Sequence, residues 1–314
     1  MTQDAPIHQP VLADDVVRLL EEVPGGWVVD GTVGLGGHSE ALLLSNPGLR
    51  IVGIDRDEQA LGLAAERLAG FGERVRLVHG NYRDLDRHLD DLGIARVGGV
   101  LLDVGVSSLQ LDRPDRGFSF RADAPLDMRM DRSSGPTASE WLLTTSEQGI
   151  VRVLREYGEE RYAGRIAKAI IVALNAGPIE STGALVKIVH RAVPGAYFGQ
   201  KIDPATRTFQ ALRIAVNDEL AALRDGLAAG FARLSIGGVL CVISFHSLED
   251  RIVKQFLREK AASCVCPPDF PECLCDKRVE AEILTKRPIV ASADEIERNA
   301  RARSAKLRAA RRVV

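Results

Sequence analysis

The first third of the chain alternates between short apolar runs and longer stretches in which apolar residues recur at helical spacing. The apolar runs are residues 27–30, 51–55, 75–78 and 99–103, and the clearest helical stretches are 37–45 and 57–69. Because each run is apolar at successive positions, it is expected to be a strand covered on both faces. The pattern predicts an α/β fold with a doubly wound, mostly parallel sheet.

The next run of this kind occurs only at 238–243, after a long amphipathic helix predicted at 206–234. The 134 residues between Asp103 and Gly238 exceed what one helix and its short loops require. The surplus contains no alternating strand, and its helical stretches are 139–155, 159–175 and 181–192. We therefore predict two domains: a discontinuous α/β domain, residues 1–111 and 204–314, and an inserted helical domain, residues 112–203.

The segment after residue 244 completes the predicted α/β domain. Its pattern predicts a helix at 249–260, a strand at 280–285 and a helix at 293–300. A last strand near 304–311 would pair antiparallel with its neighbours.

The composition fits a protein with a sizeable core, since 46% of its 314 residues are hydrophobic and 27% are charged. No run approaches the roughly 18 apolar residues of a membrane span, and the polar N-terminus lacks the features of a signal peptide. We expect a cytoplasmic protein without a membrane partner.

Charge is unevenly distributed, although the net charge is only −2. Residues 286–314 carry nine basic and three acidic side chains, whereas residues 1–103 carry nine basic and seventeen acidic ones. A basic C-terminal segment fits a polyanionic partner and fits a solvated helical tail equally well. On the first interpretation, its arginines contact phosphate groups. The candidates are Arg298, Arg301, Arg303, Arg308, Arg311 and Arg312.

The stretch WVVDGTVGLGGHSEALLLS, residues 27–45, places a glycine-rich turn between the first strand and its helix. Bare backbone at that edge of a parallel sheet is typical of nucleotide sites. The spacing Gly34-x-Gly36-x-x-Ser39 lacks the third glycine of the dinucleotide fingerprint, so it is weak on its own. Asp55 ends the second strand, where a carboxylate can bind both ribose hydroxyls. Asp30 would repel a pyrophosphate and attract a cationic ligand, so S-adenosylmethionine fits better than NAD; a purely structural turn is the third interpretation.

Other polar residues follow the remaining strands. Tyr82 is either a half-buried core residue or a ring that stacks on adenine. Asp103 ends the fourth strand, before Ser107, Ser108 and Gln110, and is interpreted as a ligand contact.

The fifth strand runs into ISFHSLED, residues 243–250. Ser244, His246 and Ser247 therefore lie at the same edge of the predicted sheet. Ser247 is expected to cap the next helix. Histidine side chains serve in acid–base chemistry near neutral pH, so the role of His246 is left open between a functional and a structural one.

A cysteine cluster follows that helix, with the spacing C-x-C-x6-C-x-C. Its members are Cys264, Cys266, Cys273 and Cys275, while Cys241 lies apart in a strand. Four thiols so close together in a cytoplasmic chain favour a metal over disulfides, and tetrahedral zinc is the natural occupant. Zinc knuckles usually have C-x2-C spacing, so reduced free thiols remain the alternative. A zinc ion here would be structural.

Many long motifs share one order with a known family. They include DGTVGLGGHS, GIDRD, LLDVGVSSLQLD, PLDMRMD, YGEERYAGRIAKAI, PATRTFQALRIAVNDEL and VISFHSLEDRIVK. From about His8 to Arg311, the chain resembles the bacterial MraW/RsmH family of 16S ribosomal RNA cytosine-N4 methyltransferases. The resemblance implies a class I, S-adenosylmethionine-dependent fold whose inserted helical domain recognises RNA. It implies as substrate a cytosine in the decoding region of the small ribosomal subunit.

The resemblance also implies which residues contact S-adenosylmethionine. Carried over to this chain, they are Gly36, Gly37, His38, Asp55, Tyr82, Asp103 and Gln110. Relatives often have phenylalanine in place of Tyr82.

The catalytic group does not follow from the resemblance, because DVGV stands where many amino-methyltransferases have a tetrapeptide of Asp, Asn or Ser followed by Pro-Pro and an aromatic residue. We predict that either Asp103 or His246 accepts a hydrogen bond from N4 of the cytosine. The alternatives are a methyltransferase for another nucleic acid or a small molecule, an NAD-dependent oxidoreductase, and a non-catalytic nucleotide-binding module.

Overall fold

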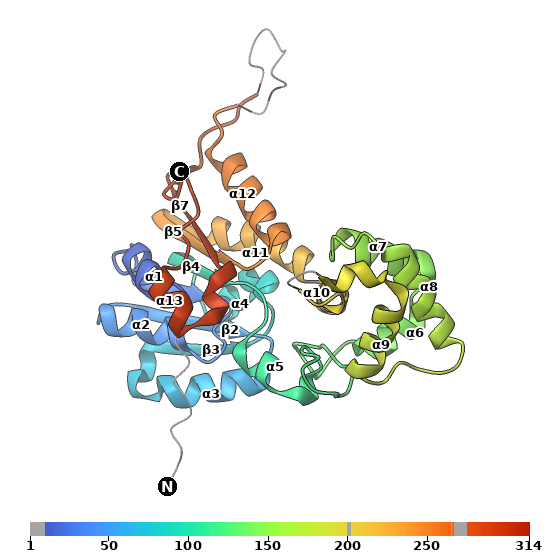
Figure 1. The fold of residues 1–314 in the computed structure, drawn as a ribbon. Coiled ribbons are helices and arrows are strands. Elements are labelled where there is room, and N and C mark those ends of the chain that lie inside the picture. Colours follow the sequence, from blue (N-terminus) through green and yellow to red (C-terminus); the bar gives the residue numbers. More distant parts are fainter. Residues whose placement is uncertain (1–9, 200–201, 265, 267–274) are drawn as a thin grey trace. The chain divides into compact units, whose positions relative to one another are not determined.

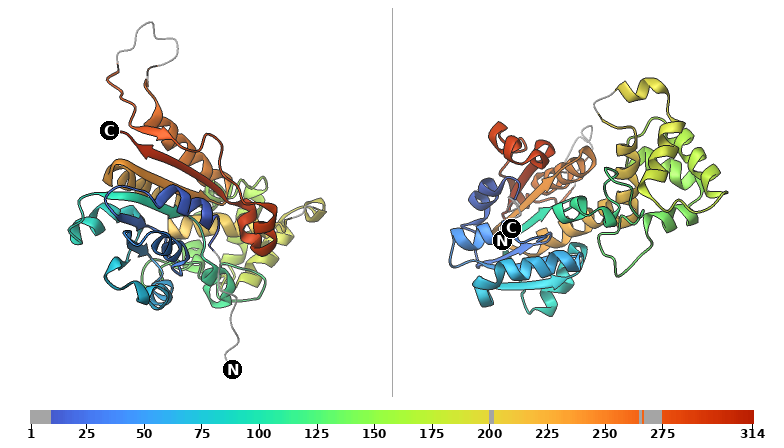
Figure 2. Two further views of the ribbon diagram at one scale, coloured as in Figure 1. Left: turned by 90° about the vertical axis from the view of Figure 1, so that its left-hand side faces the viewer. Right: turned by 60° about the horizontal axis from the view of Figure 1, so that its bottom comes forward.

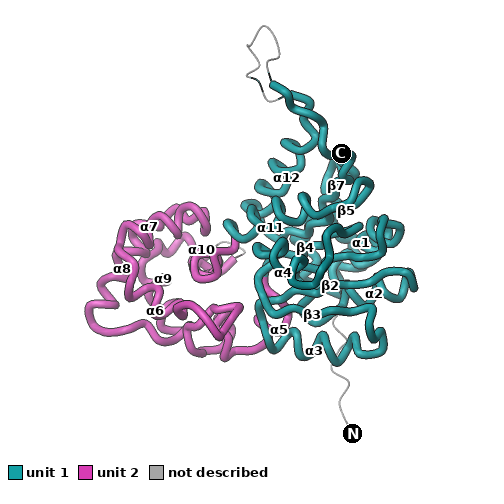
Figure 3. The backbone as a smooth tube through the Cα atoms, turned by 180° about the vertical axis from the view of Figure 1, so that it is seen from behind, with its two compact units in different colours: residues 1–105, 220–314 teal, residues 106–219 magenta. Residues whose placement is uncertain are grey.

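The computed structural model describes residues 10–199, 202–264, 266 and 275–314. The chain divides into two compact units. Unit 1 comprises residues 1–105 and 220–314, and unit 2 comprises residues 106–219 (Figure 3). Within the described residues, no helix combines the length and the apolar character needed to cross a bilayer.

Unit 1 is built on one seven-stranded sheet with the order β3-β2-β1-β4-β5-β7-β6 (Figure 1). Strands β1 to β5 are parallel, and β7 runs antiparallel between β5 and β6. The strands are β1 (Trp27–Asp30), β2 (Arg50–Asp55), β3 (Val75–His79), β4 (Val97–Asp103), β5 (Leu234–Ser244), β6 (Ala281–Ile283) and β7 (Lys306–Arg312). The predicted fold class and the antiparallel last strand are confirmed.

Helices cover both faces of this sheet (Figure 2). Alternate residues of each strand enter different cores: Val28 packs with α1, α2 and α3, whereas Val29 packs with α4, α11 and α12. Two-sided burial is the reason why the strand sequences are apolar at successive positions. The helices are α1 (Ala13–Leu20), α2 (Gly37–Ser45), α3 (Glu58–Leu68), α4 (Leu85–Asp91), α11 (Glu219–Arg233), α12 (Ser247–Ala261) and α13 (Ala293–Arg298).

Unit 2 is helical, with its own hydrophobic core. Its α-helices are α5 (Ser108–Asp112), α6 (Ala138–Thr144), α7 (Glu147–Glu156), α8 (Ala163–Leu174), α9 (Thr182–Ala192) and α10 (Ala205–Asn217). The single helix predicted at 139–155 is two helices, because Ser146 caps α7 through a hydrogen bond from the Gly149 N–H.

The second boundary of unit 2 lies at residue 219 rather than at the predicted 203. The helix predicted at 206–234 ends at Asn217, and Asp218 adopts a left-handed φ of 50°. The Asn217 side chain donates to the Met128 carbonyl at 2.7 Å and accepts from the Met130 N–H at 2.8 Å. Because α10 buries Phe209 and Leu212 in the core of unit 2, the break separates two helices of different units.

Candidate functional site

The glycine loop after β1 is held between the two neighbouring strands of unit 1. The Gly31 N–H donates to the Leu101 carbonyl at 2.9 Å, and the Val33 N–H donates to the Ile54 carbonyl at 3.0 Å. A Cβ on Gly31 would lie 2.6 Å from Leu102 Cδ2, so this position has no room for a side chain. Gly36 has a φ of 80°, which favours glycine, and α2 begins there without a side-chain cap from any described residue. The first-turn N–H groups of α2 therefore remain available to a ligand.

Asp30 lies behind this loop and is only 1% exposed. Its carboxylate accepts hydrogen bonds from Ser39 Oγ at 2.7 Å and from the Thr32 N–H at 3.3 Å. Burial raises the pKa of Asp30, and the His38 ring and the Ser39 hydroxyl oppose that rise. Asp30 thus organises the loop from inside, and its negative charge acts on a ligand only through space.

Asp55 joins the glycine loop to the end of β2. One carboxylate oxygen accepts the Gly34 N–H at 2.8 Å, and the other accepts the Asp57 N–H at 2.9 Å. Burial raises the pKa of Asp55 to about 6, against these two backbone hydrogen bonds. The side chain is half-buried, and each oxygen keeps a lone pair for a further donor such as a ribose hydroxyl.

Asp103 and His38 face one another across the same edge of the sheet. His38 Nε2 lies 3.5 Å from Asp103 Oδ2, and the Asp103 N–H donates to Thr32 Oγ1 at 2.7 Å. Both His38 ring nitrogens and Asp103 Oδ1 are buried without a hydrogen-bond partner among the described residues. Because buried polar atoms are nearly always hydrogen-bonded, these three atoms indicate a place where a ligand supplies partners.

Tyr82 follows β3 and is half-buried. Its ring lies against α11, because a Cβ on Gly226 would come within 2.4 Å of Tyr82 Cδ2. That edge of the Tyr82 ring is therefore packed in the protein core, as one of the two predicted roles requires.

The predicted cap of α12 is wrong by one residue. His246, not Ser247, is the N-cap, and it forms a reciprocal capping box with Glu249. One Glu249 oxygen accepts the Phe245 and His246 N–H groups at 2.8 and 3.2 Å, and the other lies 2.9 Å from His246 Nε2. His246 is therefore a helix cap whose ring is positioned by the buried Glu249, but its Nε2 is buried without a hydrogen-bond partner among the described residues, so a functional role stays open.

Gln110 belongs to unit 2. Its side chain accepts the Ser107 N–H at 3.1 Å, and Ser107 Oγ accepts the Gln110 N–H in return, so the two residues cap α5. Among the predicted cofactor residues, the loop glycines with His38, Asp55, Tyr82 and Asp103 all lie at the carboxyl edge of the sheet in unit 1.

Internal contacts occupy several arginines of the predicted phosphate-binding set. Arg308 is 9% exposed and makes two hydrogen bonds to Asp250, at 2.7 and 3.3 Å. Arg311 pairs with Glu282 at 3.0 Å, and Arg312 donates to the Ala232 and Leu234 carbonyls at 2.8 Å. These contacts hold β7 within unit 1, so the phosphate hypothesis loses support for all three arginines, most of all for the buried Arg308.

The remaining arginines of that set lie in α13 and η5 (Ala300–Ser304). Arg298 and Arg303 are exposed, and Arg301 is half-buried. Arg298 Nε donates to the Asp294 carbonyl at 3.2 Å, within its own helix. The phosphate hypothesis remains open for these three residues.

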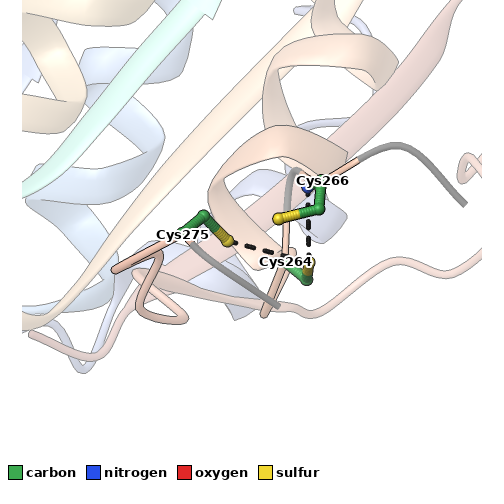
Figure 4. Close-up of side chains that lie close together, drawn as sticks. All are labelled: Cys264, Cys266 and Cys275. Carbon is green, nitrogen blue, oxygen red and sulfur yellow. Dashed lines mark hydrogen bonds between the residues drawn. The ribbon is translucent and has the colours of Figure 1, made fainter. Parts of the chain in front are cut away.

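Three cysteines of the predicted cluster lie together beyond α12 (Figure 4). The Sγ atoms of Cys264, Cys266 and Cys275 all lie within 4.8 Å of one another, and those of Cys264 and Cys275 are 3.7 Å apart. Cys273 lies outside the described residues. Cys241 is buried in β5, where burial raises the pKa of its thiol.

Comparison with known proteins identifies the family. A family model described as the MraW methylase family matches residues 5–313. The chain belongs to this family.

Close relatives cover the chain almost completely. One from Heliobacterium modesticaldum is 52% identical over 98% of both chains, and one from Syntrophotalea carbinolica is 51% identical over the full length of both. A third, from Geotalea uraniireducens, is 51% identical over 98% of both chains. Each of these relatives is named Ribosomal RNA small subunit methyltransferase H. The resemblance to the MraW/RsmH family is confirmed.

Sequence reasoning missed the residues that support the site from behind. Thr32 and Ser39 hold Asp103 and Asp30, respectively. Glu249 holds the turn after β5. A signal existed only for Glu249, as the third residue after a helix cap, and histidine is not among the usual capping residues.

Proposed function

We propose that the protein transfers a methyl group from S-adenosylmethionine to N4 of a cytosine in the decoding region of 16S ribosomal RNA. The observation that carries the proposal is the group of buried polar atoms without hydrogen-bond partners among the described residues at the carboxyl edge of the unit 1 sheet, in a chain of the MraW methylase family. The relatives' names supply the ribosomal RNA of the small subunit as substrate class. A ribosomal substrate also supports a cytoplasmic location.

The residues at the carboxyl edge of the sheet fit S-adenosylmethionine. Asp55 would accept the ribose hydroxyls, and the loop around Gly36 and Gly37 would approach the amino-acid part of the ligand closely. The uncapped start of α2 suits its carboxylate, while His38 and Asp103 offer buried polar atoms that need partners. The half-buried ring of Tyr82 would contact the adenine. Gln110, whose side chain caps α5 in unit 2, is proposed as a cofactor contact on the family resemblance alone.

When bound, S-adenosylmethionine supplies an electrophilic methyl group, which N4 accepts as the carbon–sulfur bond breaks and a neutral thioether leaves. The lone pair of N4 is delocalised into the ring, so the protein must align the amine and accept its proton. We assign the acceptor role to Asp103, because its Oδ1 has no hydrogen-bond partner among the described residues and Thr32 fixes its backbone. His246 Nε2 also lacks a hydrogen-bond partner there, but the ring caps α12 and Nε2 lies 2.9 Å from Glu249, so His246 is the second candidate.

Mass spectrometry of ribosomal RNA nucleosides tests this function. Small subunits from a strain lacking the gene are incubated with the purified protein and S-adenosylmethionine. The expected product is N4-methylcytidine at one position, with turnover reduced about 10²- to 10⁴-fold in Asp103→Ala and retained in an exposed control, Asp112→Ala. Methylation of another nucleic acid, or of small molecules only, would redirect the assignment to the alternative substrate classes.

We also propose that the cysteine cluster binds a structural zinc ion. Tetrahedral zinc with bonds of about 2.3 Å places its sulfur ligands about 3.8 Å apart. The 3.7 Å between the sulfurs of Cys264 and Cys275 is close to this spacing, and Cys266 lies in the same group. The fourth ligand is predicted to be Cys273, from the repeated C-x-C spacing.

Elemental analysis of the purified protein tests the zinc proposal. One zinc per chain is expected, lost in Cys264→Ser and Cys275→Ser and kept in Cys241→Ala, which removes a thiol outside the cluster. A metal-free native protein, or zinc that survives both serine variants, would refute the site.

A further inference from the structure

Unit 2 carries an exposed aromatic residue beside basic side chains. Phe198, in η4 (Gly195–Gly199), is 47% exposed, which is unusual for a large ring. It follows Tyr197, which is buried and donates its hydroxyl hydrogen to Glu160 at 2.9 Å. The exposed ring is therefore attached to an anchored neighbour, which limits its freedom.

Ring contacts connect η4 to the two neighbouring helices. The Tyr197 ring meets Tyr162, just before α8, edge to face with centroids 5.0 Å apart. The Phe198 ring meets His190, in α9, edge to face at 4.9 Å. Despite this contact, nearly half of the Phe198 side chain remains exposed.

Basic side chains lie on or just before the two helices that contribute to this group of rings, and two of them contact Tyr162. The guanidinium groups of Arg161 and Arg165 both lie 5.9 Å from the centre of the Tyr162 ring. Lys168 continues the exposed side of α8, and Arg191 follows His190 in α9. None of these four cations forms an ion pair with a described residue, whereas His190 pairs with Asp203 at 2.9 Å.

Exposed arginines in the same cluster as an exposed aromatic ring are typical of single-stranded nucleic-acid binding sites. Every base has a π-face that stacks on an aromatic side chain, and arginine binds the adjoining phosphates. An apolar protein surface would fit the ring but would leave the cations without complementary charge. The combination of an exposed ring and cations that pair with no described residue therefore favours RNA as the ligand.

We propose that Phe198, with Arg161 and Arg165, forms a docking platform on unit 2 for an unpaired nucleotide of the RNA substrate. The base stacks on Phe198, and the adjoining phosphates bind the two arginines. This proposal rests on the proposed function, since it concerns RNA that flanks the methylated base.

Binding and turnover of small subunits by full-length variants test the platform. Phe198→Ala is expected to weaken subunit binding roughly 5- to 150-fold, the effect of losing one stacked base, and to raise KM with little change in kcat. Phe198→Tyr should retain affinity, because it keeps the ring. Arg161→Gln with Arg165→Gln should reduce the slope of log affinity against log salt by about 1.4, the value for two phosphates of a single strand.

Matched controls lie in the same unit. Leu143→Ala removes another exposed apolar side chain, and Arg152→Gln with Arg155→Gln removes two exposed charges from α7. Neither control should change subunit affinity, and S-adenosylmethionine affinity should be equal in all variants. The platform would be refuted if Phe198→Ala kept the wild-type KM, or if Leu143→Ala lost as much subunit affinity as Phe198→Ala. Methylation by the wild-type protein would show in either case that the proposed function still holds. Absence of methyl transfer by the wild type would instead refute the proposed function.

Discussion

Replacing Ser39 by alanine tests whether the glycine loop depends on the buried carboxylate behind it. Ser39 and Asp30 are both almost fully buried, and their side chains share a 2.7 Å hydrogen bond. The substitution removes one donor from a carboxylate that cannot turn to water. Ser45→Ala is the matched control, because Ser45 is exposed in the same helix.

The expected loss of stability in Ser39→Ala follows from the burial of the Asp30 carboxylate, which loses its hydroxyl donor. Removing a hydrogen bond to a buried charged acceptor costs about 1.5–3 kcal/mol, whereas the control should change stability by less than about 0.5 kcal/mol. The hydroxyl also lowers the pKa of Asp30, which burial raises, so the variant should raise that pKa further. The loss of stability should thus be largest where Asp30 is ionised and should shrink as the pH falls and the carboxyl binds a proton.

Urea unfolding at several pH values measures this effect, and a double-mutant cycle with Asp30→Asn isolates the pair. A coupling free energy of about 1 kcal/mol or more is expected, together with weaker S-adenosylmethionine binding in Ser39→Ala. Equal stability of Ser39→Ala and Ser45→Ala, or a coupling near zero, would show that the buried pair does not organise the loop.

Three further predictions concern the same unit. Calorimetry between pH 5 and 8 should show S-adenosylmethionine affinity falling as the pH drops through about 6, where Asp55 binds a proton, and a flat profile in Asp55→Asn; a pH-independent wild type would contradict the ribose assignment. Without ligand, the free energy of unfolding should change in the opposite sense. It should fall as the pH rises from about 4 to about 6, because the raised pKa of Asp55 makes its ionised form unfavourable in the folded protein. Glu249→Ala leaves two backbone N–H groups without their acceptor and should cost about 1–3 kcal/mol in urea unfolding, whereas the exposed Glu259→Ala should be neutral. Arg308→Met should cost a similar amount, because it removes both guanidinium hydrogen bonds to the Asp250 carboxylate and leaves Lys306, 3.5 Å away, as its cationic partner. The salt dependence of RNA binding should stay unchanged, and a shallower slope would support the phosphate role.

Most strands of the sheet were predictable, because the apolar run that indicates a buried strand lies within the strand itself. Strands between two helical layers must be apolar on both faces, so β1, β2 and β4 are visible as continuous runs. The glycine loop was predictable for a similar reason, since few other features of a chain require glycines between a strand and a helix.

The features that escaped prediction depend on contacts between distant residues. The end of α10 at Asn217 is determined by hydrogen bonds to Met128 and Met130, nearly ninety residues away. The pairing of Arg308 with Asp250 spans 58 residues, so charge density alone assigned that arginine to RNA. A histidine cap was missed because capping preferences point to the adjacent serine.

The most direct test of the central claim is equilibrium binding of S-adenosylmethionine to the wild-type protein and to Asp55→Ala, with NAD as the comparison ligand. We predict saturable binding of one S-adenosylmethionine per chain, a loss of affinity in the variant, and no binding of NAD. Binding of NAD instead, or S-adenosylmethionine affinity that is the same in the variant, would contradict a methyl-donor site at the carboxyl edge of this sheet.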